Sequence, residues 1–153
     1  MPYTRKVQYY ETDMMGIVHH ANYLHWMEEA RIEFMDRLGF PYISLEEKGI
    51  VSPVRSVTCE YKKACAFGDE IEVEVSVLSF NGVVLTFLYE MRSQKGEAVC
   101  RARSEHVLLN REGHFVRVKR DLPEFGEAID RAIAERESRK EGVKAEKQDE
   151  NEV

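Results

Sequence analysis

The sequence predicts an α+β domain in which a curved antiparallel sheet wraps around one long helix. Two patterns predict this arrangement. Between residues 21 and 38, apolar side chains recur at steps of three and four, as on one face of an α-helix. From residue 50 onward the period changes to two, which indicates strands with one buried face and one wet face. A long sheet with one apolar face must cover that face, and the helix is the economical cover.

The N-terminal part is expected to contain a strand, a loop and the long helix, in that order. The strand runs from Thr4 to Tyr10, and the loop after it contains Asp13 and Gly16. Asn22, or the residues just before it, could cap the start of the helix. The apolar stripe of this helix consists of Tyr23, Met27, Ala30, Phe34 and Leu38.

The helix is followed by a clear stop signal. Gly39 suits the left-handed conformation that ends many helices, and Pro41 cannot continue one. A short helical turn is then expected from Ser44 to Lys48, ended by Gly49. It connects the helix to the sheet.

The rest of the sheet is expected from a series of short strands joined by turns. Asn81-Gly82 lies between two alternating runs and is the strongest short hairpin signal in the chain. An open sheet leaves edge strands, which two copies can satisfy by pairing, so a dimer is expected. The expected strands span residues 54–66, 71–77, 83–91, 98–109 and 115–118.

The C-terminal part changes character after a final amphipathic helix, expected over residues 122–134. Nearly all residues from Arg136 to Val153 are polar or charged and none is aromatic, which predicts a helix end that fades into a disordered tail. The folded domain is therefore expected to cover residues 1–135, with a tail over residues 136–153.

Length and composition limit the classes of function. The 153 residues suit one domain, and the net charge of −6 argues against a general nucleic-acid or anionic-membrane binder. No apolar run approaches the roughly 20 residues that span a bilayer, and no apolar N-terminal stretch resembles a signal peptide. We therefore expect a cytoplasmic protein without a membrane span. Cys59, Cys65 and Cys100 form no CxxC pair and are expected to be small buried hydrophobes.

The stretch before the long helix carries the residues suited to catalysis. Asp13 supplies a carboxylate, Gly16 a turn, and the helix start near His20 supplies unpaired backbone N–H groups with partial positive charge. Such donors can stabilise an oxyanion while the carboxylate attacks a carbonyl or activates water. From the residues alone, a cap or a solvated turn residue is the commoner role for an aspartate at such a place.

Residues 9 to 23 contain a motif that consists of Tyr9, Thr12-Asp13, Gly16-Ile17-Val18, His19, His20 and Tyr23. The motif resembles the active-site signature of the 4-hydroxybenzoyl-CoA thioesterase family, and of the related bacterial acyl-CoA thioesterases associated with the Tol–Pal system. The likeness continues through Glu29-Ala30-Arg31 and covers about residues 3 to 125.

The resemblance implies a hotdog fold and hydrolysis of an acyl-CoA thioester to a carboxylic acid and free CoA. It makes Asp13 the catalytic carboxylate, as nucleophile or as general base on water. It places at His20 the backbone N–H that binds the thioester carbonyl, and a histidine there is itself implicated in catalysis in the Tol–Pal branch. Tyr9 would lie beside the carboxylate, Gly16 would allow the tight turn, and Tyr23 would wall the acyl pocket.

The resemblance also implies an assembly and a coenzyme site. Family sites lie at the interface of a homodimer, many members are homotetramers, and no metal or redox cofactor is expected. Arg117 matches a phosphate-contacting arginine of the hydroxybenzoyl branch, with Lys119 close in sequence, and Lys62 with Lys63 forms a second basic spot. Ordinary surface charge is the alternative interpretation of these cations.

The sequence departs from the family pattern at two places, and other functions are possible for such a chain. Met14-Met15 replaces a smaller pair and Ala21 stands where some members have proline, which leaves the acyl group open. Hydrolysis of an acyl group on acyl carrier protein is one alternative; a non-catalytic acyl-CoA-binding module is another, which has no need of Asp13. A metal site at His19, His20 and His25 is disfavoured because adjacent histidines point in different directions.

Overall fold

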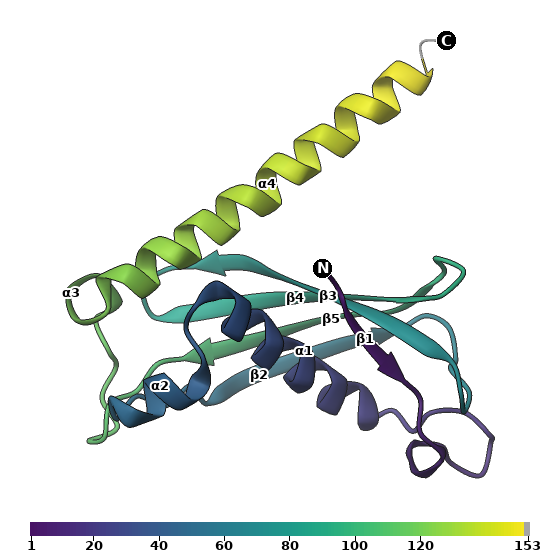
Figure 1. The fold of residues 1–153 in the computed structure, drawn as a ribbon, viewed down its shortest axis with the longest axis horizontal. Coiled ribbons are helices and arrows are strands. Elements are labelled where there is room, and N and C mark those ends of the chain that lie inside the picture. Colours follow the sequence, from purple (N-terminus) through teal and green to yellow (C-terminus); the bar gives the residue numbers. More distant parts are fainter. Residues whose placement is uncertain (152–153) are drawn as a thin grey trace.

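The computed structural model describes residues 1–151, with side chains described through residue 148. Five antiparallel strands form one sheet in the order β1-β3-β4-β5-β2, and helix α1 lies against one face of it (Figure 1). This confirms the predicted antiparallel sheet around a long helix. The strands are β1 (Tyr3–Lys6), β2 (Val54–Tyr61), β3 (Glu70–Phe80), β4 (Val84–Ser93) and β5 (Ala98–Val107). The helices are η1 (Tyr9–Glu11, a 3-10 turn), α1 (Asn22–Leu38), α2 (Tyr42–Glu47), α3 (Val118–Asp121) and α4 (Pro123–Asn151).

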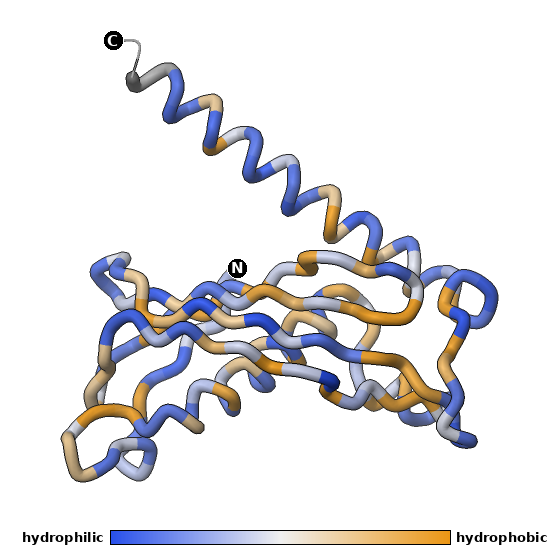
Figure 2. Tube along the Cα trace, turned by 180° about the vertical axis from the view of Figure 1, so that it is seen from behind, coloured by the Kyte–Doolittle hydropathy of each residue, from blue (hydrophilic) through white to orange (hydrophobic). Residues whose placement is uncertain are grey.

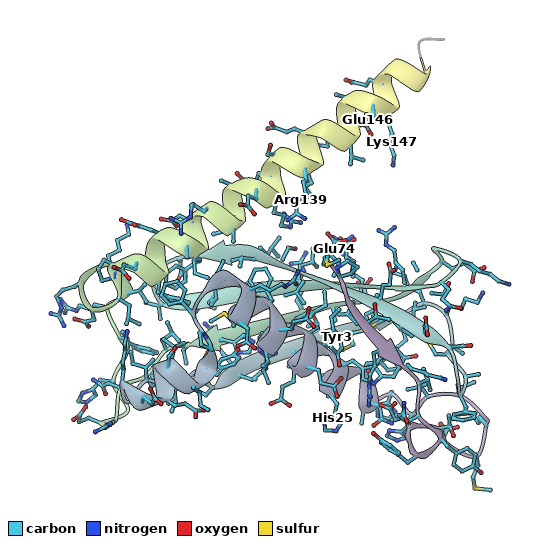
Figure 3. All side chains as sticks on the ribbon, in the orientation of Figure 1. Tyr3, His25, Glu74, Arg139, Glu146 and Lys147 are labelled. Atoms are coloured by element: carbon cyan, nitrogen blue, oxygen red, sulfur yellow. The ribbon has the colours of Figure 1, made fainter. Side chains whose placement is uncertain are left out.

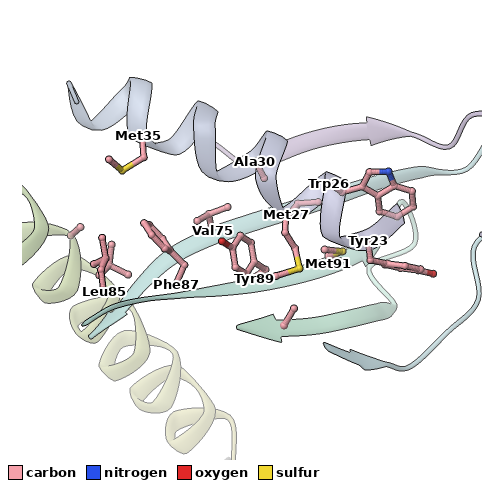
Figure 4. Packing of buried hydrophobic residues seen from close by; sticks show 14 of the residues in the cluster. Tyr23, Trp26, Met27, Ala30, Met35, Val75, Leu85, Phe87, Tyr89 and Met91 are labelled. Carbon is pink, nitrogen blue, oxygen red and sulfur yellow. The ribbon is translucent and has the colours of Figure 1, made fainter. Parts of the chain in front are cut away.

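Helix α1 and the inner face of the sheet enclose the core (Figure 4). Phe34 meets Phe87 of β4 edge-on, with ring centroids 6.0 Å apart. Gly39 ends the helix at φ +92°, and its N–H donates to the carbonyls of the last turn, so the predicted stop is confirmed. The buried residues of α1 are Tyr23, Trp26, Met27, Ala30, Arg31 and Met35.

The start of α1 differs from the prediction. The residue before the helix is Ala21, whose backbone is already helical, and no side chain caps the first turn. The Asn22 side chain instead donates from Nδ2 to the carbonyl of Glu11, 2.8 Å away. Asn22 is therefore not the cap, because its amide bonds across the loop. Among the residues just before it, His19 accepts the Ala21 N–H through Nδ1, at 3.2 Å.

The hairpin between β3 and β4 forms at the predicted turn. Asn81 Oδ1 accepts hydrogen bonds from the N–H groups of Val83 and Val84, at 2.9 and 2.7 Å. Gly82 takes φ +92°, which side chains with a Cβ rarely adopt. This local chemistry sets the register next to the turn, where Phe80 lies opposite Leu85, and an irregularity between Val77 and Ser79 shifts the pairing beyond it.

Several predicted strands have other bounds in the structure. The strand predicted at 54–66 ends at Tyr61, and the one predicted at 98–109 ends at Val107. The first strand stops at Lys6, because residues 9–11 turn into η1. The strand predicted at 115–118 is wrong. Only an isolated bridge joins Phe115 to Leu109, and Arg117 instead precedes helix α3, its N–H donating to the Asp121 carboxylate at 3.3 Å. Because β5 ends at Val107, residues 115–118 have no regular strand beside them, within residues 1–151, with which to pair.

Helix α4 packs against strand β3 and then leaves the sheet (Figure 1). Its first half buries an apolar face, and Phe125 meets Phe40 edge-on, with ring centroids 5.2 Å apart. The helix runs on to Asn151 as one rod, where the sequence predicts a disordered tail from Arg136. The projecting half is mainly hydrophilic (Figure 2) and rich in helix-forming Glu, Lys, Arg and Ala. The buried residues of the first half are Phe125, Ala128, Ile129 and Ala132.

Where α4 leaves the sheet, the contact becomes electrostatic. Arg139 faces Glu74 of β3 across the gap (Figure 3), with Nη1 and Oε1 3.5 Å apart. Glu146 and Lys147 lie farther out on the rod (Figure 3). No helix within residues 1–151 combines the length and the apolar character that crossing a bilayer requires.

Candidate active site

The loop between η1 and α1 closes on itself around Asp13. The Asp13 N–H donates to the Ile17 carbonyl at 2.9 Å, and the Gly16 N–H donates to the Asp13 carbonyl at 3.0 Å. Gly16 has φ +79°, so the tight turn requires glycine there. The Met15 N–H donates to Asp13 Oδ1 at 2.8 Å. This bond holds one carboxylate oxygen, and Oδ2 has no hydrogen-bond partner among residues 1–148.

Asp13 borders a cavity of about 280 Å³ at the N-terminal end of α1. His20 and Tyr23 line the same cavity, so the structure brings together three of the residues predicted to act in catalysis or substrate binding. The other residues that line it are Met15, Ile17, Val18, Tyr61, Lys62, Lys63 and Ala64. The cavity thus combines a carboxylate, apolar walls and two lysines.

The start of α1 has a free backbone N–H on a residue that lines this cavity. The His19 N–H donates to the Glu11 carbonyl at 2.8 Å, the Ala21 N–H to His19 Nδ1 at 3.2 Å, and the Asn22 N–H to the His19 carbonyl at 3.0 Å. The N–H of His20, between them, finds no acceptor in the part of the chain that the structure describes. It is therefore available to a ligand oxygen.

His20 is exposed but held from both sides. Its ring lies 4.3 Å from the His19 ring and meets Tyr61 edge-on at 6.4 Å. The Tyr61 hydroxyl donates to the His20 carbonyl at 3.0 Å. Tyr23 below is 3% exposed, and its hydroxyl donates to Cys65 Sγ at 3.6 Å. Burial raises the pKa of Tyr23, so the hydroxyl stays neutral in the pocket wall.

Glu11 anchors this whole loop, although it is only 1% exposed. Its carboxylate accepts from Trp26 Nε1 at 2.7 Å and from the Gln8 N–H at 2.8 Å, and it pairs with Arg5 at 3.2 Å. Its carbonyl accepts from the His19 N–H and from Asn22 Nδ2. A single residue therefore ties strand β1, the Asp13 loop and the first turns of α1 together.

Tyr9 lies near the loop through its backbone and not through its ring. Its side chain is 77% exposed and packs edge-on against Phe67, with ring centroids 5.8 Å apart. Its carbonyl accepts a hydrogen bond from Thr12 Oγ1 at 2.8 Å. The Tyr9 ring is not among the side chains that line the Asp13 cavity.

The predicted phosphate contacts lie at the other end of the molecule. Arg117 and Lys119 are exposed at α3, at the opposite end of the sheet from the Asp13 loop (Figure 1). One chain therefore does not bring them to the cavity. Lys62 and Lys63 do line it, each within an ion pair, with Glu60 at 3.7 Å and with Glu97.

Sequence reasoning missed the residues that support the loop. Trp26 follows Tyr23 by three positions on the same helix face, a spacing that could have added it to the apolar stripe. Glu11 gave no such signal, because an acidic residue next to Thr12-Asp13 has the appearance of a solvated loop residue. Only its contacts with distant residues show it to be buried.

This fold and pocket place the chain in the class of hotdog-fold thioesterases. It superposes on the DHNA-CoA thioesterase from Staphylococcus aureus with a TM-score of 0.83 and 29% identity, covering 89% of this chain and 92% of that one. A hypothetical protein from Aquifex aeolicus matches with a TM-score of 0.77 and 35% identity, covering 84% of this chain and 98% of that one.

The sequence comparisons agree, and the chain belongs to the thioesterase-like superfamily, whose model matches residues 7–136. The putative acyl-CoA thioesterase YneP of Bacillus subtilis is 35% identical over 128 residues, which is 83% of this chain and 93% of that protein. The predicted family and fold are confirmed, and the chain is a thioester hydrolase.

Proposed function

We propose that this protein hydrolyses acyl-CoA thioesters, with Asp13 as nucleophile or general base and the His20 N–H as oxyanion donor. One observation carries the proposal: Asp13 and His20 line one cavity, and the His20 N–H has no acceptor within the described residues. The names of similar proteins support the substrate class, since YneP is a putative acyl-CoA thioesterase and the S. aureus structure is a DHNA-CoA thioesterase.

The geometry suggests how the two groups divide the work. A thioester carbonyl that accepts from the His20 N–H is polarised, and the same bond strengthens as negative charge develops on its oxygen. Asp13, held through Oδ1, has Oδ2 free to attack the carbonyl carbon or to take a proton from water. Attack by Asp13 expels CoA thiolate and leaves an acyl anhydride that water cleaves. Attack by water gives the acid in one displacement.

The coenzyme would extend from the cavity toward cations. Lys62 and Lys63 stand at the cavity within the same chain. Arg117 and Lys119 belong to the proposal only through a second copy. Antiparallel pairing of edge strand β2 with its counterpart brings opposite ends of two chains together, so the α3 end of one copy would approach the Asp13 loop of the other.

A homodimer is part of the proposal. Strand β2 is an edge strand with unpaired backbone groups along its outer side. It exposes large apolar side chains, with Val54 at 50%, Val57 at 39% and Tyr61 at 48%. Apolar residues on an open edge favour pairing with another strand. A homotetramer of two such dimers remains a prediction from the family.

Location and domain limits also remain predictions. The three cysteines are free thiols in the structure, in keeping with the reducing cytoplasm. Residues 1–135 are proposed as the catalytic domain, with the projecting half of α4 outside it.

The test is thiol release from a panel of acyl-CoAs by the wild type and three variants. Asp13→Asn should lower kcat by at least about 10²-fold while the protein stays folded. His20→Pro removes the unpaired N–H, whereas His20→Ala keeps it. A much larger loss in the proline variant would identify the amide as the oxyanion donor, and equal losses would contradict that role.

The alternatives make different predictions in the same experiment. If the wild type binds acyl-CoA without releasing thiol, the protein is a binding module and the hydrolase proposal fails. If it cleaves acyl groups on acyl carrier protein much faster than the matching CoA esters, the carrier-protein alternative replaces free CoA esters.

A further inference from the structure

The middle of helix α1 buries a positive charge that no carboxylate neutralises. Arg31 is 9% exposed. It donates from Nε to the Tyr42 hydroxyl at 2.9 Å and from Nη1 to the Tyr89 hydroxyl at 3.0 Å. None of the ion pairs formed within residues 1–148 includes Arg31. Buried arginines are usually paired with an anion, because an uncompensated charge in the interior is costly.

The groups around Arg31 orient it without supplying negative charge. Burial raises the pKa of both Tyr42 and Tyr89, so neither hydroxyl is ionised. The network continues from Tyr89 to Ser104 Oγ and on to His106 Nε2, with 2.7 Å at each step. Burial and the nearby Arg31 charge lower the pKa of His106 to about 4, so this imidazole is neutral. The network is thus a neutral frame around one cation.

The guanidinium borders a cavity of about 360 Å³ between α1, α2 and the residues that lead into β2. A guanidinium has five N–H groups, and the two tyrosines accept from two of them, which leaves three without an acceptor among residues 1–148. Ile32, Leu45 and Ile50 provide apolar wall. The carboxylates of Glu28 and Glu46, both exposed residues, also line the cavity.

We propose that this cavity binds one carboxylate attached to a small apolar body, with Arg31 as the residue that contacts it. The planar fork of a guanidinium matches the two oxygens of a carboxylate. The apolar wall suits a short aliphatic or aromatic body, and the volume suits a small acid. Glu28 and Glu46 disfavour a second negative charge, so phosphate and dicarboxylates with both charges inside are poor ligands.

The carboxylate has two possible sources. One is a free carboxylic acid, which is also the kind of product that thioester hydrolysis releases. The other is the far end of an acyl group whose thioester sits at Asp13 of a paired copy. Antiparallel pairing of β2 with its counterpart would place the Val54 end, which borders this cavity, beside the Tyr61 end, which borders the Asp13 cavity. This second source rests on the proposed function; the binding site itself does not.

The first measurement is binding of hexanoate and of neutral hexanamide to the full chain by calorimetry, with the Arg31 Nε–H resonance as the local reporter. Hexanoate should bind the wild type at least tenfold more tightly than hexanamide and shift that resonance. Arg31→Gln should weaken hexanoate binding at least tenfold. Arg37→Gln, on the same helix but outside this cavity, should leave it unchanged.

The second measurement separates the two sources. It compares kcat/KM for adipoyl-CoA, which ends in a carboxylate, with that for hexanoyl-CoA. If the ratio of kcat/KM for adipoyl-CoA to that for hexanoyl-CoA is at least tenfold lower in Arg31→Gln than in the wild type, the acyl group is the source of the carboxylate. An unchanged ratio with weakened hexanoate binding identifies a free acid. Absence of any acyl-CoA hydrolysis by the wild type would overturn the proposed function alone, because the calorimetry still tests the cavity.

The proposal is overturned if the wild type binds hexanoate no better than hexanamide and a folded Arg31→Gln keeps the adipoyl preference. Should Arg31→Gln fail to fold, Tyr42→Phe takes its place, because it keeps the ring and removes only the acceptor that orients Nε. Tyr42→Phe is expected to weaken hexanoate binding about threefold. Unchanged binding in that variant, together with no preference for hexanoate in the wild type, counts against the site.

Discussion

Two buried charges meet helix α1, and their surroundings differ. At its N-terminal end, the Glu11 carboxylate has a cation, an indole N–H and a backbone N–H as partners. In its middle, the Arg31 guanidinium has two neutral tyrosine hydroxyls as its partners among residues 1–148. The fully hydrogen-bonded Glu11 carboxylate holds its neighbours in place, and so positions the loop that carries Asp13. The Arg31 guanidinium has N–H groups without a protein acceptor within the described residues, which can bind a ligand.

The largest effect is expected when the fully paired Glu11 carboxylate is removed. Glu11→Ala leaves Arg5 and Trp26 Nε1 without a partner, so we expect a loss of about 3 kcal/mol in unfolding free energy. Activity should fall through kcat as the Asp13 loop loosens. Chemical denaturation and steady-state kinetics measure the two effects.

Glu29→Gln is the matched control, because Glu29 pairs with the same arginine, at 3.4 Å, from a side chain that is 38% exposed. It should cost about 1 kcal/mol or less and leave kcat unchanged. Equal costs for the two variants would show that burial of Glu11 is not what holds the loop.

His106, at the end of the neutral hydrogen-bond network around Arg31, predicts that the unfolding free energy depends on pH. The pKa of His106 is about 4 when folded and 6.5 as the reference value, so the unfolded chain takes up a proton first as pH falls. Stability should be complete above about pH 6.5 and decline toward pH 4, by up to about 3 kcal/mol from this group. Denaturation of the wild type and His106→Gln across this range measures it. A wild-type decline no steeper than that of the variant would contradict the assignment.

Asn22 tests the link between the loop and the helix on a smaller scale. Asn22→Ala removes the bond to the Glu11 carbonyl while leaving the His19 N–H bond to the same oxygen. We expect a loss of about 1 kcal/mol and a several-fold lower kcat at unchanged KM. His25→Ala, at an exposed position of the same helix, should change neither quantity. A change in KM alone would assign Asn22 to substrate binding instead of positioning.

The smallest effect is expected at the far end of α4. Ending the chain after Glu135 removes the exposed Arg139–Glu74 pair, so the midpoint of thermal unfolding should shift by only a few degrees. Ile129→Ala, within the buried half of the same helix, should cost about 2 to 5 kcal/mol. A large loss on truncation would place the domain boundary beyond residue 135.

Local sequence determined the elements whose causes lie within a few residues. The apolar stripe of α1, its Gly39 stop, the Asn81-Gly82 hairpin and the Asp13–Gly16 turn each depend on periodicity or turn chemistry that neighbouring residues supply. The same holds for the motif that brings Asp13, His20 and Tyr23 to one cavity, because the turn and the helix start are adjacent in sequence.

Tertiary structure decided what depends on distant partners. Glu11 is an anchor because Arg5 and Trp26 meet it, and Arg31 is a candidate ligand contact because Tyr42 and Tyr89 enclose it without an anion. The packing of α4 against β3 and the separation of Arg117 from the Asp13 cavity likewise depend on how whole elements pack together. Burial and pairing over such distances depend on how whole elements dock, which residue type and spacing along the chain do not specify.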